Sequence, residues 1–313
     1  MNRRNFLINS AVLSAAMTPA FSRASGLLSP LALPVGVQLY TMGKLMETDP
    51  KGTLQKLAAL GVKDVESAGS SKGVWYGYKP AEFAKMVSDC GMKWESAHVG
   101  GVKFTLAALL KMAKNKEDSV KFQKYAPMLE KASQAPNLSD NLQELVDGAA
   151  EGRIGYLVCA AYPMKTMDDL KDAVEVFSKA GEACKKAGLQ FAFHNHTEEF
   201  VPIDGVVPYD YIMEHTDKEL VKSELDLGWA SVADRDPVQI FQKYPGRIPL
   251  WHVKDINKKT SEPVEIGQGF IDFKRIFDHR KTSGMKHFFI EQDGAPDPLV
   301  NIKNSVEKIR KMA

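Results

Sequence analysis

Histidine and carboxylate side chains gather in the second half of the 313-residue chain, and each follows directly on a short apolar run. A buried carboxylate or imidazole is costly unless it is paired or coordinated to a cation. Nitrogen and oxygen ligands together suit a borderline-to-hard divalent cation such as Mn²⁺, Zn²⁺, Mg²⁺ or Co²⁺. Four consecutive strands end in a His, an Asp, a His and a Glu, and this mix predicts one divalent-metal site among His194 or His196, Asp226, His252 and Glu291.

The two-residue spacing of these groups predicts which side chains face the same way. In a strand, residues i and i+2 lie on one face, so His194 and His196 can point to the same side while Asn195 points to the other. The same spacing relates two further pairs, Glu224 with Asp226 and His252 with Lys254.

Each of these residues also has an ordinary structural explanation. A single histidine at a strand end is often a hydrogen-bonded structural residue. Asp226 could cap the helix that follows it, and Glu291 could pair with an arginine. Lys254 and Asp255 could form an ion pair with each other. The coincidence of all these groups in consecutive strands favours the metal site.

Short apolar strands alternate with amphipathic helices along the chain and would position these groups. We expect strands at 35–40, 62–66, 92–99, 155–160, 189–194, 221–227, 249–253 and 287–291. Helix starts are marked by a cap or a first-turn proline at Asp49-Pro50, Thr166–Asp169, Asp236-Pro237 and Asp272. Eight strands interleaved with helices over about 250 residues predict a (β/α)₈ TIM barrel, whose active site lies at the C-terminal ends of the strands. An open doubly wound sheet alternates similarly, but the strand count and the lack of a glycine-rich turn after the first strand favour the barrel.

The barrel is expected to be a single domain over residues 34–313, with a helical insertion at 103–150 between strands three and four. The helical parts of this insertion are expected at Lys103–Ala113 and Val120–Ala132. They could cover the mouth of the barrel or form a subunit contact, which leaves a homo-oligomer open. An amphipathic helix more often packs against its own domain.

The first 24 residues have the pattern of an export signal. Arg3-Arg4 precedes an apolar stretch that contains no acid and is too short to span a membrane. The paired arginines followed by Phe6-Leu7 resemble a twin-arginine signal, and Ser22-Arg23-Ala24 offers a cleavage site after Ala24. The alternative is a merely basic N-terminal helix. We expect a protein that folds with its cofactor in the cytoplasm and is exported to the periplasm without a membrane anchor.

The composition excludes several classes of function. Lys and Arg total 41 against 39 Asp and Glu, a formal charge of +2, so the chain has no electrostatic excess for holding a nucleic acid. The three cysteines are an odd number without CxxC spacing, which argues against a disulfide framework or a thiolate zinc site.

Six short motifs give the sequence a resemblance to a known family. Over roughly residues 35–312, apart from much of 103–150, it resembles the sugar phosphate isomerase/epimerase family of xylose isomerase-like TIM barrels. This group also includes inosose dehydratases, ketose 3-epimerases and the endonuclease IV fold. The motifs that carry the resemblance are Gly-Val-Gln-Leu-Tyr-Thr (36–41), Ala-His-Val-Gly (97–100), Phe-His-Asn-His-Thr-Glu-Glu-Phe (193–200), Glu-Leu-Asp-Leu-Gly-Trp (224–229), His-Val-Lys-Asp (252–255) and Ile-Glu-Gln-Asp (290–293).

The resemblance implies a divalent metal, often Mn²⁺, held by one side chain from each of strands five to eight. Three of the implied ligands match directly: Asp226, His252 and Glu291. Many ketose epimerases have a glutamate where this chain has His194, and they use it with the strand-eight glutamate as an acid/base pair. That two-glutamate mechanism cannot be transferred unmodified to this chain. His194 or His196 could serve as the ligand instead, or Glu199 could swing in.

The chemistry expected of such a site is proton transfer next to a sugar carbonyl through an enediolate. The base is expected to be Glu291 or His196, with Lys254 compensating the developing negative charge. The residues expected to bind the sugar are Gln38, Glu66, His98 and, by stacking on a ring, Trp229.

Export argues for a non-phosphorylated substrate, such as a free sugar, a keto-glycoside or an inositol-like polyol. The expected activity is that of an isomerase or epimerase, and a lyase that eliminates a β-substituent is the alternative. Two other hypotheses are an exported sugar-binding barrel without catalysis and an endonuclease IV-like phosphodiesterase. The near-neutral charge and the export signal argue against the phosphodiesterase.

Overall fold

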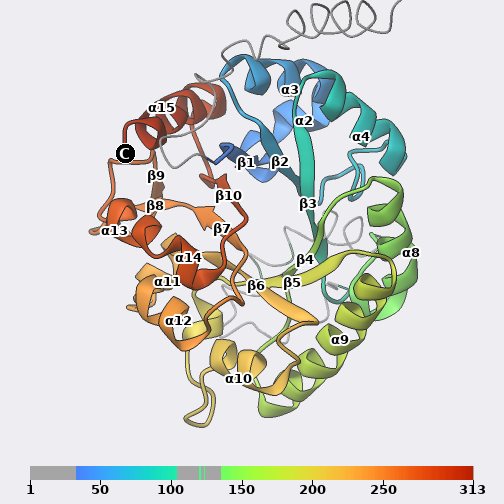
Figure 1. Cartoon of the computed structure of the whole chain (residues 1–313), viewed down its shortest axis with the longest axis vertical. Coiled ribbons are helices and arrows are strands. Elements are labelled where there is room, and N and C mark those ends of the chain that lie inside the picture. Colours follow the sequence, from blue (N-terminus) through green and yellow to red (C-terminus); the bar gives the residue numbers. More distant parts are fainter. Residues whose placement is uncertain (1–32, 104–119, 121–122, 124–134, 313) are drawn as a thin grey trace, which may run out of the picture.

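The computed structural model describes residues 33–103, 120, 123 and 135–312, and within them it shows a closed barrel of eight parallel strands (Figure 1). The strand order around the barrel is β1-β10-β7-β6-β5-β4-β3-β2. The strands are β1 (Gly36–Gln38), β2 (Asp64–Ser67), β3 (Lys93–Gly100), β4 (Tyr156–Ala161), β5 (Gln190–His194), β6 (Val221–Asp226), β7 (Leu250–Val253) and β10 (His287–Ile290). The barrel prediction is confirmed, and each predicted strand overlaps an observed one.

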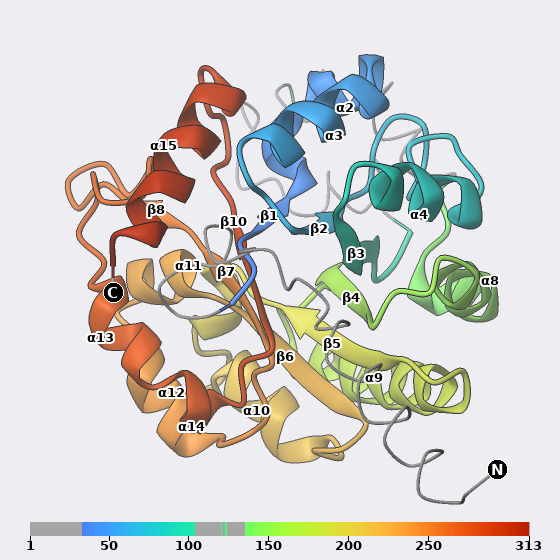
Figure 2. The same cartoon turned by 45° about the horizontal axis from the view of Figure 1, so that its top comes forward.

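Helices surround the barrel in chain order, and the turned view in Figure 2 shows the same outer ring. The α-helices are α2 (Lys44–Thr48), α3 (Pro50–Ala59), α4 (Pro80–Asp89), α8 (Leu138–Glu151), α9 (Met167–Lys186), α10 (Pro208–His215), α11 (Leu227–Val232), α12 (Pro237–Lys243), α13 (Phe273–Asp278), α14 (Arg280–Ser283) and α15 (Pro298–Arg310). Two 3₁₀ turns, η1 (Leu39–Met42) and η2 (Glu198–Phe200), and a short antiparallel pair, β8 (Asp255–Ile256) with β9 (Pro263–Val264), complete the described elements. None of the helices in these residues is long and apolar enough to cross a membrane.

The predicted helix starts are found where the sequence places them. Asp49 caps α3 by accepting a hydrogen bond from the Gly52 N–H at 2.9 Å. Thr166 and Asp169 form a reciprocal capping box at the start of α9. Each cap satisfies N–H groups that have no partner inside the helix. These capped helices therefore begin at defined residues, and each preceding strand ends before the cap.

Part of the region between β3 and β4 can be described. The helix α8 begins after its cap Asn137, and it packs between α4 and α9 in the outer ring (Figure 1). Apart from Lys103, Val120 and Gln123, the helices expected at Lys103–Ala113 and Val120–Ala132 lie outside the described residues, and so does the export signal at 1–24.

The interior of the barrel consists of an apolar layer below a polar one. Val158, Ala192, Leu250 and Phe289 form a small cluster apart from the main core, which lies between the strands and the helices. Because side chains alternate along a strand, the residues two positions further on also face the interior. In β5, β7 and the end of β10 these are His194, His252 and Glu291.

Candidate active site

Pairing between neighbouring strands brings the polar residues to one height in the barrel. His194 of β5 lies opposite Glu224 of β6, and Asp226 of β6 lies opposite His252 of β7. A cavity of about 560 Å³ opens above them at the C-terminal ends of the strands. Its charged and titratable lining residues are His98, His194, His196, Lys254, Glu291 and Asp293.

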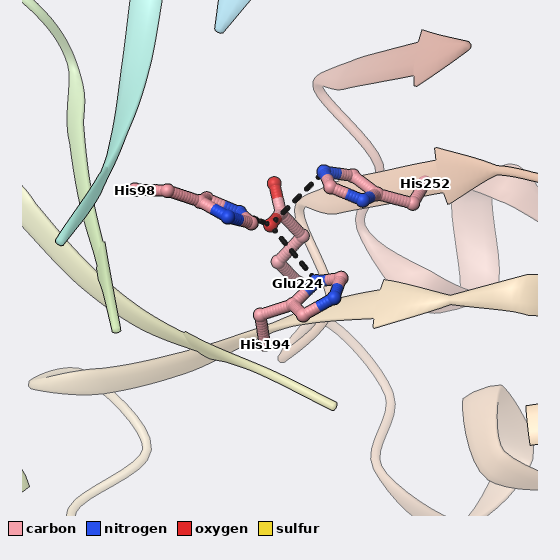
Figure 3. A group of neighbouring side chains, drawn as sticks. All are labelled: His98, His194, Glu224 and His252. Carbon is pink, nitrogen blue, oxygen red and sulfur yellow. Dashed lines mark hydrogen bonds and ion pairs between the residues drawn. The ribbon is translucent and has the colours of Figure 1, made fainter. Parts of the chain in front are cut away.

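The Glu224 carboxylate is the centre of the deepest cluster, where three imidazoles converge on it (Figure 3). Its Oε2 atom lies 2.5 Å from His98 Nε2, 3.2 Å from His194 Nδ1 and 3.2 Å from His252 Nε2. Its Oε1 atom is buried and has no hydrogen-bond partner among the described residues. Burial raises the pKa of Glu224, but the imidazoles of His252 and His98 outweigh burial and hold the pKa well below its usual value. Glu224 is therefore an ionised carboxylate inside the barrel.

Gln38 and Glu66, which we expected to bind the sugar, lie deeper than the cavity wall. Both are fully buried. Glu66 accepts hydrogen bonds from Gln38 Nε2 at 2.7 Å and from the Ser96 hydroxyl, and it lies 2.6 Å from His252 Nε2. Neither residue lines the cavity. Glu66 contacts the inner edge of His252, and Gln38 contacts Glu66. Their role in binding the sugar stays a prediction.

The three predicted carboxylate and histidine ligands of strands six to eight do lie together. His252 Nδ1 is 2.8 Å from Glu291 Oε2 and 3.9 Å from Asp226 Oδ2. The Lys254 ammonium lies against both carboxylates, at 2.9 Å and 3.0 Å, and 2.7 Å from Asp293 Oδ2. Lys254 therefore neutralises part of a dense group of buried negative charge.

The electrostatics of this group follow from burial and from its neighbours. Burial raises the pKa of Asp226 to about 6, against the opposing effect of the Lys254 ammonium. Burial also raises the pKa of Glu291, but Lys254 and His252 outweigh it and hold that pKa well below its usual value. For His252, burial lowers the pKa, and the carboxylates of Glu224 and Glu291 raise it well above its usual value.

Asp226 has the capping role that its position predicts, whereas Lys254 and Asp255 do not pair with each other. Asp226 does cap the next helix, because its Oδ1 atom accepts a hydrogen bond from the Trp229 N–H at 2.8 Å. Its Oδ2 atom points to the group above and lacks a hydrogen bond within the described chain. Lys254 does not pair with Asp255. The Asp255 carboxylate instead accepts backbone N–H groups from Gly267 and Gly269 in the loop beyond β9.

The prediction for the two histidines of strand five is confirmed. Both line the cavity, and their ring centroids are 5.0 Å apart. Asn195 points the other way, where its side-chain oxygen accepts a hydrogen bond from the Asp226 N–H at 3.1 Å. Burial lowers the pKa of His196, and lowers that of His194 well below its usual value. Glu199 is buried and accepts a hydrogen bond from the His196 N–H at 2.7 Å.

The expected stacking role of Trp229 is not supported. Trp229 lies in the first turn of α11, where the Lys254 ammonium sits 4.8 Å from its ring centroid, and it is not among the residues that line the cavity. The aromatic side chain on the lining is Tyr40, which is 58% exposed. The sequence did not single out Tyr40 or Asp293, although they stand in the motifs 36–41 and 290–293. Glu224 could have been found from its two-residue spacing to Asp226.

The donor atoms present fit a divalent cation. Two groups each place their ligand atoms within 4.8 Å of one another, and the groups share His252. Its Nδ1 atom faces Asp226 and Glu291, and its Nε2 atom faces Glu224. The predicted fourth ligand, His194, belongs to the deeper group with His98, Glu224 and His252. Glu224 Oε1 has no hydrogen-bond partner among the described residues and has a lone pair to offer, while Asp226 Oδ2 faces the Lys254 ammonium at 3.0 Å.

Comparison with known proteins agrees with this architecture. Two crystal structures of sugar phosphate isomerase/epimerases from Parabacteroides distasonis superpose with TM-scores of 0.70 and 0.68. They are 27% and 25% identical to this chain, cover 89% of it, and match over 98% and 93% of their own lengths.

An inosose dehydratase from Clostridium perfringens is 28% identical over 148 residues, which are 41% of this chain and 49% of that protein. The chain thus matches about half the length of this curated relative. The relatives are sugar-modifying enzymes, either isomerases and epimerases or dehydratases. The profile of the family described as "Xylose isomerase-like TIM barrel" matches residues 54–312, and the chain belongs to that family.

Proposed function

We propose that this protein is a divalent-metal-dependent isomerase or epimerase of a non-phosphorylated sugar, keto-glycoside or polyol, and that it acts through an enediolate. The observation that carries the proposal is the single cavity wall on which Glu291, Lys254 and His196 stand beside His252 and Asp226. Abstraction of a proton next to a carbonyl needs a base, and it needs positive charge near the oxygen that becomes negative.

The residues that would hold the metal are Asp226, His252 and Glu291, whose ligand atoms lie within 4.8 Å of one another. His194, the ligand predicted from strand five, lies in the neighbouring group around Glu224. When bound, a metal such as Mn²⁺ would polarise the sugar carbonyl as a Lewis acid. The deeper carboxylate Glu66 holds the opposite edge of His252 and keeps Nδ1 directed to Glu291. Carboxylate partners of this kind orient metal-bound histidines in many proteins.

His196 is the best-placed base. Its ring lines the cavity and has no hydrogen-bond partner in the part of the chain that the structure describes. The Glu291 carboxylate, by contrast, is already engaged by His252 and Lys254. Lys254 is positioned to stabilise negative charge on the substrate oxygen, because its ammonium reaches the cavity while its stem is buried.

The charge of the lining favours a substrate without phosphate. Lys254 is the single Lys or Arg among the described lining residues, and three carboxylates already surround it. A phosphate group needs unpaired cationic donors or a cluster of backbone N–H groups. Passage through an export pathway, predicted from residues 1–24, would lead to the same class of substrate.

The second candidate is β-elimination from a keto-sugar or inosose. His196 and Lys254 both carry N–H groups that could protonate a departing hydroxyl on the same wall as Glu291. The curated relative from Clostridium perfringens is an inosose dehydratase. Both reactions begin with the same proton abstraction and differ in their products. One experiment that identifies the product can therefore distinguish them.

The experiment is a reaction of the Mn²⁺-loaded protein with keto-sugars and inososes in D₂O, followed by NMR and mass spectrometry. An epimerase or isomerase incorporates deuterium at carbon with retention of all oxygens, whereas a lyase gives a product that has lost water. EDTA should abolish either activity, and Mn²⁺ should restore it. A sugar-binding barrel without catalysis would keep its ligand in EDTA and exchange no deuterium.

The variant Asp226→Ala should lose both the bound metal, measured by elemental analysis, and turnover. Asp168→Ala is the matched control, because Asp168 is exposed on α9. Full metal content and full activity in Asp226→Ala would overturn the proposed site.

A further inference from the structure

The cavity has two walls of different chemistry, and only one of them is used by the proposed reaction. We infer that the natural substrate is a keto-glycoside with a flat apolar aglycone, which the second wall binds while the sugar faces the catalytic groups. This inference rests on the proposed function and adds a substrate class to it.

The reactive wall lies over β5, β7 and β10. It presents His194, His196, Lys254 and Glu291, all within the polar layer described above. These groups can bind hydroxyl and carbonyl oxygens by charge-assisted hydrogen bonds. The sugar ring belongs on this side of the cavity.

Among the described residues, the second wall consists mostly of small apolar side chains and backbone, with Ser70, His98 and Asn137 as the polar residues on the same segments. It is formed by the segments that follow β2, β3 and β4 and by the start of α8, and its residues include Ala68, Gly69, Val74, Val102, Pro136 and Ala161. A hydroxyl-rich sugar placed there would lose hydrogen bonds to water and gain few in return, which is unfavourable. An apolar ring placed there gains the free energy of removing its surface from water.

The size of the cavity agrees with a substrate larger than a single sugar. A hexose displaces about six waters of liquid volume, on the order of 180 Å³, and the cavity measures about 560 Å³. Cavities of this size are typical of sites that enclose larger ligands. A monosaccharide alone would leave most of the second wall without contact.

Two lining residues, one on the second wall and one at the edge of the reactive wall, suggest how an aglycone could be held. A Cβ atom built on Gly69 meets no atom within 4 Å, so this backbone faces open space without steric support from a neighbour. Tyr40 lies in η1 after β1, near Asp293, Glu291 and Lys254, and it lines the same cavity while more than half exposed. Exposed aromatic surface of this kind suits an offset-stacked or edge-on contact with another ring.

The test compares a phenyl keto-glucoside with the corresponding free keto-glucose. Dissociation constants are measured by NMR titration, contact of the phenyl protons by saturation transfer, and exchange by deuterium incorporation. We expect the phenyl glycoside to bind about tenfold more tightly than the free sugar. Saturation should pass from the protein to the phenyl protons.

Two variants fill the second wall from different elements. Gly69→Leu acts from the segment after β2, where the open space accepts a side chain, and Ala161→Leu acts from the end of β4. Each should bring the ratio of the two dissociation constants close to one. Gly69→Ala is the matched control and should keep the ratio, because a methyl group leaves room for the ring. Thermal melts identify a variant that fails to fold, and two independent positions keep the test decisive.

The outcomes separate this inference from the proposed function. A ratio near one in the unmodified protein, or a ratio unchanged in both leucine variants, overturns the apolar wall; deuterium exchange in the same samples would leave the proposed function standing. Tighter binding of the phenyl glycoside without exchange supports the wall and contradicts the proposed function. A keto-disaccharide that binds more tightly than the phenyl glycoside would overturn the apolar aglycone in favour of a second sugar.

Discussion

The position of a single carboxylate decides how His252 can act. Glu66 lies 2.6 Å from His252 Nε2 and is itself held by Gln38 and Ser96. A proton on His252 Nε2 is donated to the Glu66 carboxylate. With the proton on Nε2, the Nδ1 atom has a lone pair for a metal on the side of Asp226 and Glu291. Residues of this kind change metal affinity without touching the metal.

We therefore expect Glu66→Gln to weaken divalent-metal binding by about 10- to 100-fold, because a neutral amide holds the imidazole less firmly than a carboxylate does. Affinity is measured by competition with a chromophoric chelator, which does not depend on turnover. The matched control is Glu175→Gln on the exposed face of α9. Equal affinities in Glu66→Gln and the unmodified protein would show that Glu66 does not orient the ligand.

A second buried carboxylate makes a prediction about pH. Burial raises the pKa of Glu199 from 4.5 to about 7. Because the folded state holds the proton more tightly than the unfolded state, the stabilisation from this group is complete below about pH 4.5 and is lost as the pH rises through 7.

The free energy of unfolding should therefore fall between pH 5 and pH 8 by up to about 3 kcal/mol more in the unmodified protein than in Glu199→Gln. Urea denaturation of both proteins in EDTA at the two pH values measures the difference. Glu198→Gln, next to it and exposed, should behave like the unmodified protein. Parallel pH profiles for Glu199→Gln and the unmodified protein would contradict the buried, protonated carboxyl.

At the scale of the elements, the sequence predicts positions along the chain better than depth in the barrel. The caps at Asp49 and Thr166 and the strand ends at His194 and Asp226 are local signals, because each depends on residues within one turn or one strand. They are found where the sequence predicts them. The polar residues that end strands five to eight could therefore be named in advance.

Depth depends on pairing between strands, which no local pattern contains. The register of β2 against β3 shifts between Val65 and Glu66, so that Glu66 lies opposite Ser96 and not opposite Glu95. The shift occurs at Glu66 itself, which lies beneath His252 and does not line the cavity. Alternation alone predicted that Glu66 faces the interior, but it could not predict that the residue would be covered.

The position of Trp229 also depends on structure that its motif does not show. The sequence Glu-Leu-Asp-Leu-Gly-Trp shows that a strand ends near Asp226, but the Asp226 side chain also starts α11. Trp229 therefore turns with a helix, and its ring packs near Lys254 instead of on the cavity lining. Glu224 was seen only as a companion of Asp226, because three of its contacts come from other strands: β3, β5 and β7.

At the scale of the whole molecule, the buried charge connects the fold to the route by which the protein would reach its place of action. Glu66, Glu224, Asp226 and Glu291 are all buried within one barrel interior together with Lys254 and three histidines. Such a group is stable only in the closed barrel, where the partners are assembled, and a divalent cation would add to that stability. We propose that the chain folds, and acquires its metal, before the export that residues 1–24 predict.

The twin-arginine pattern at Arg3-Arg4 is consistent with that order of events and makes the last prediction. In a bacterial host with this pathway, the full chain should appear in the periplasmic fraction, shortened after Ala24. The double variant Arg3→Lys, Arg4→Lys keeps the charge but removes the guanidinium pair, so it should remain in the cytoplasm at full length. Arg23→Lys, in the same segment but outside the pair, should be exported normally.

Fractionation with immunoblotting and N-terminal sequencing measures the export of all three proteins. Equal export of the double variant would mean that the segment acts as a general secretory signal. The metal would then have to bind after translocation, and a buried carboxylate cluster would have to assemble outside the cytoplasm.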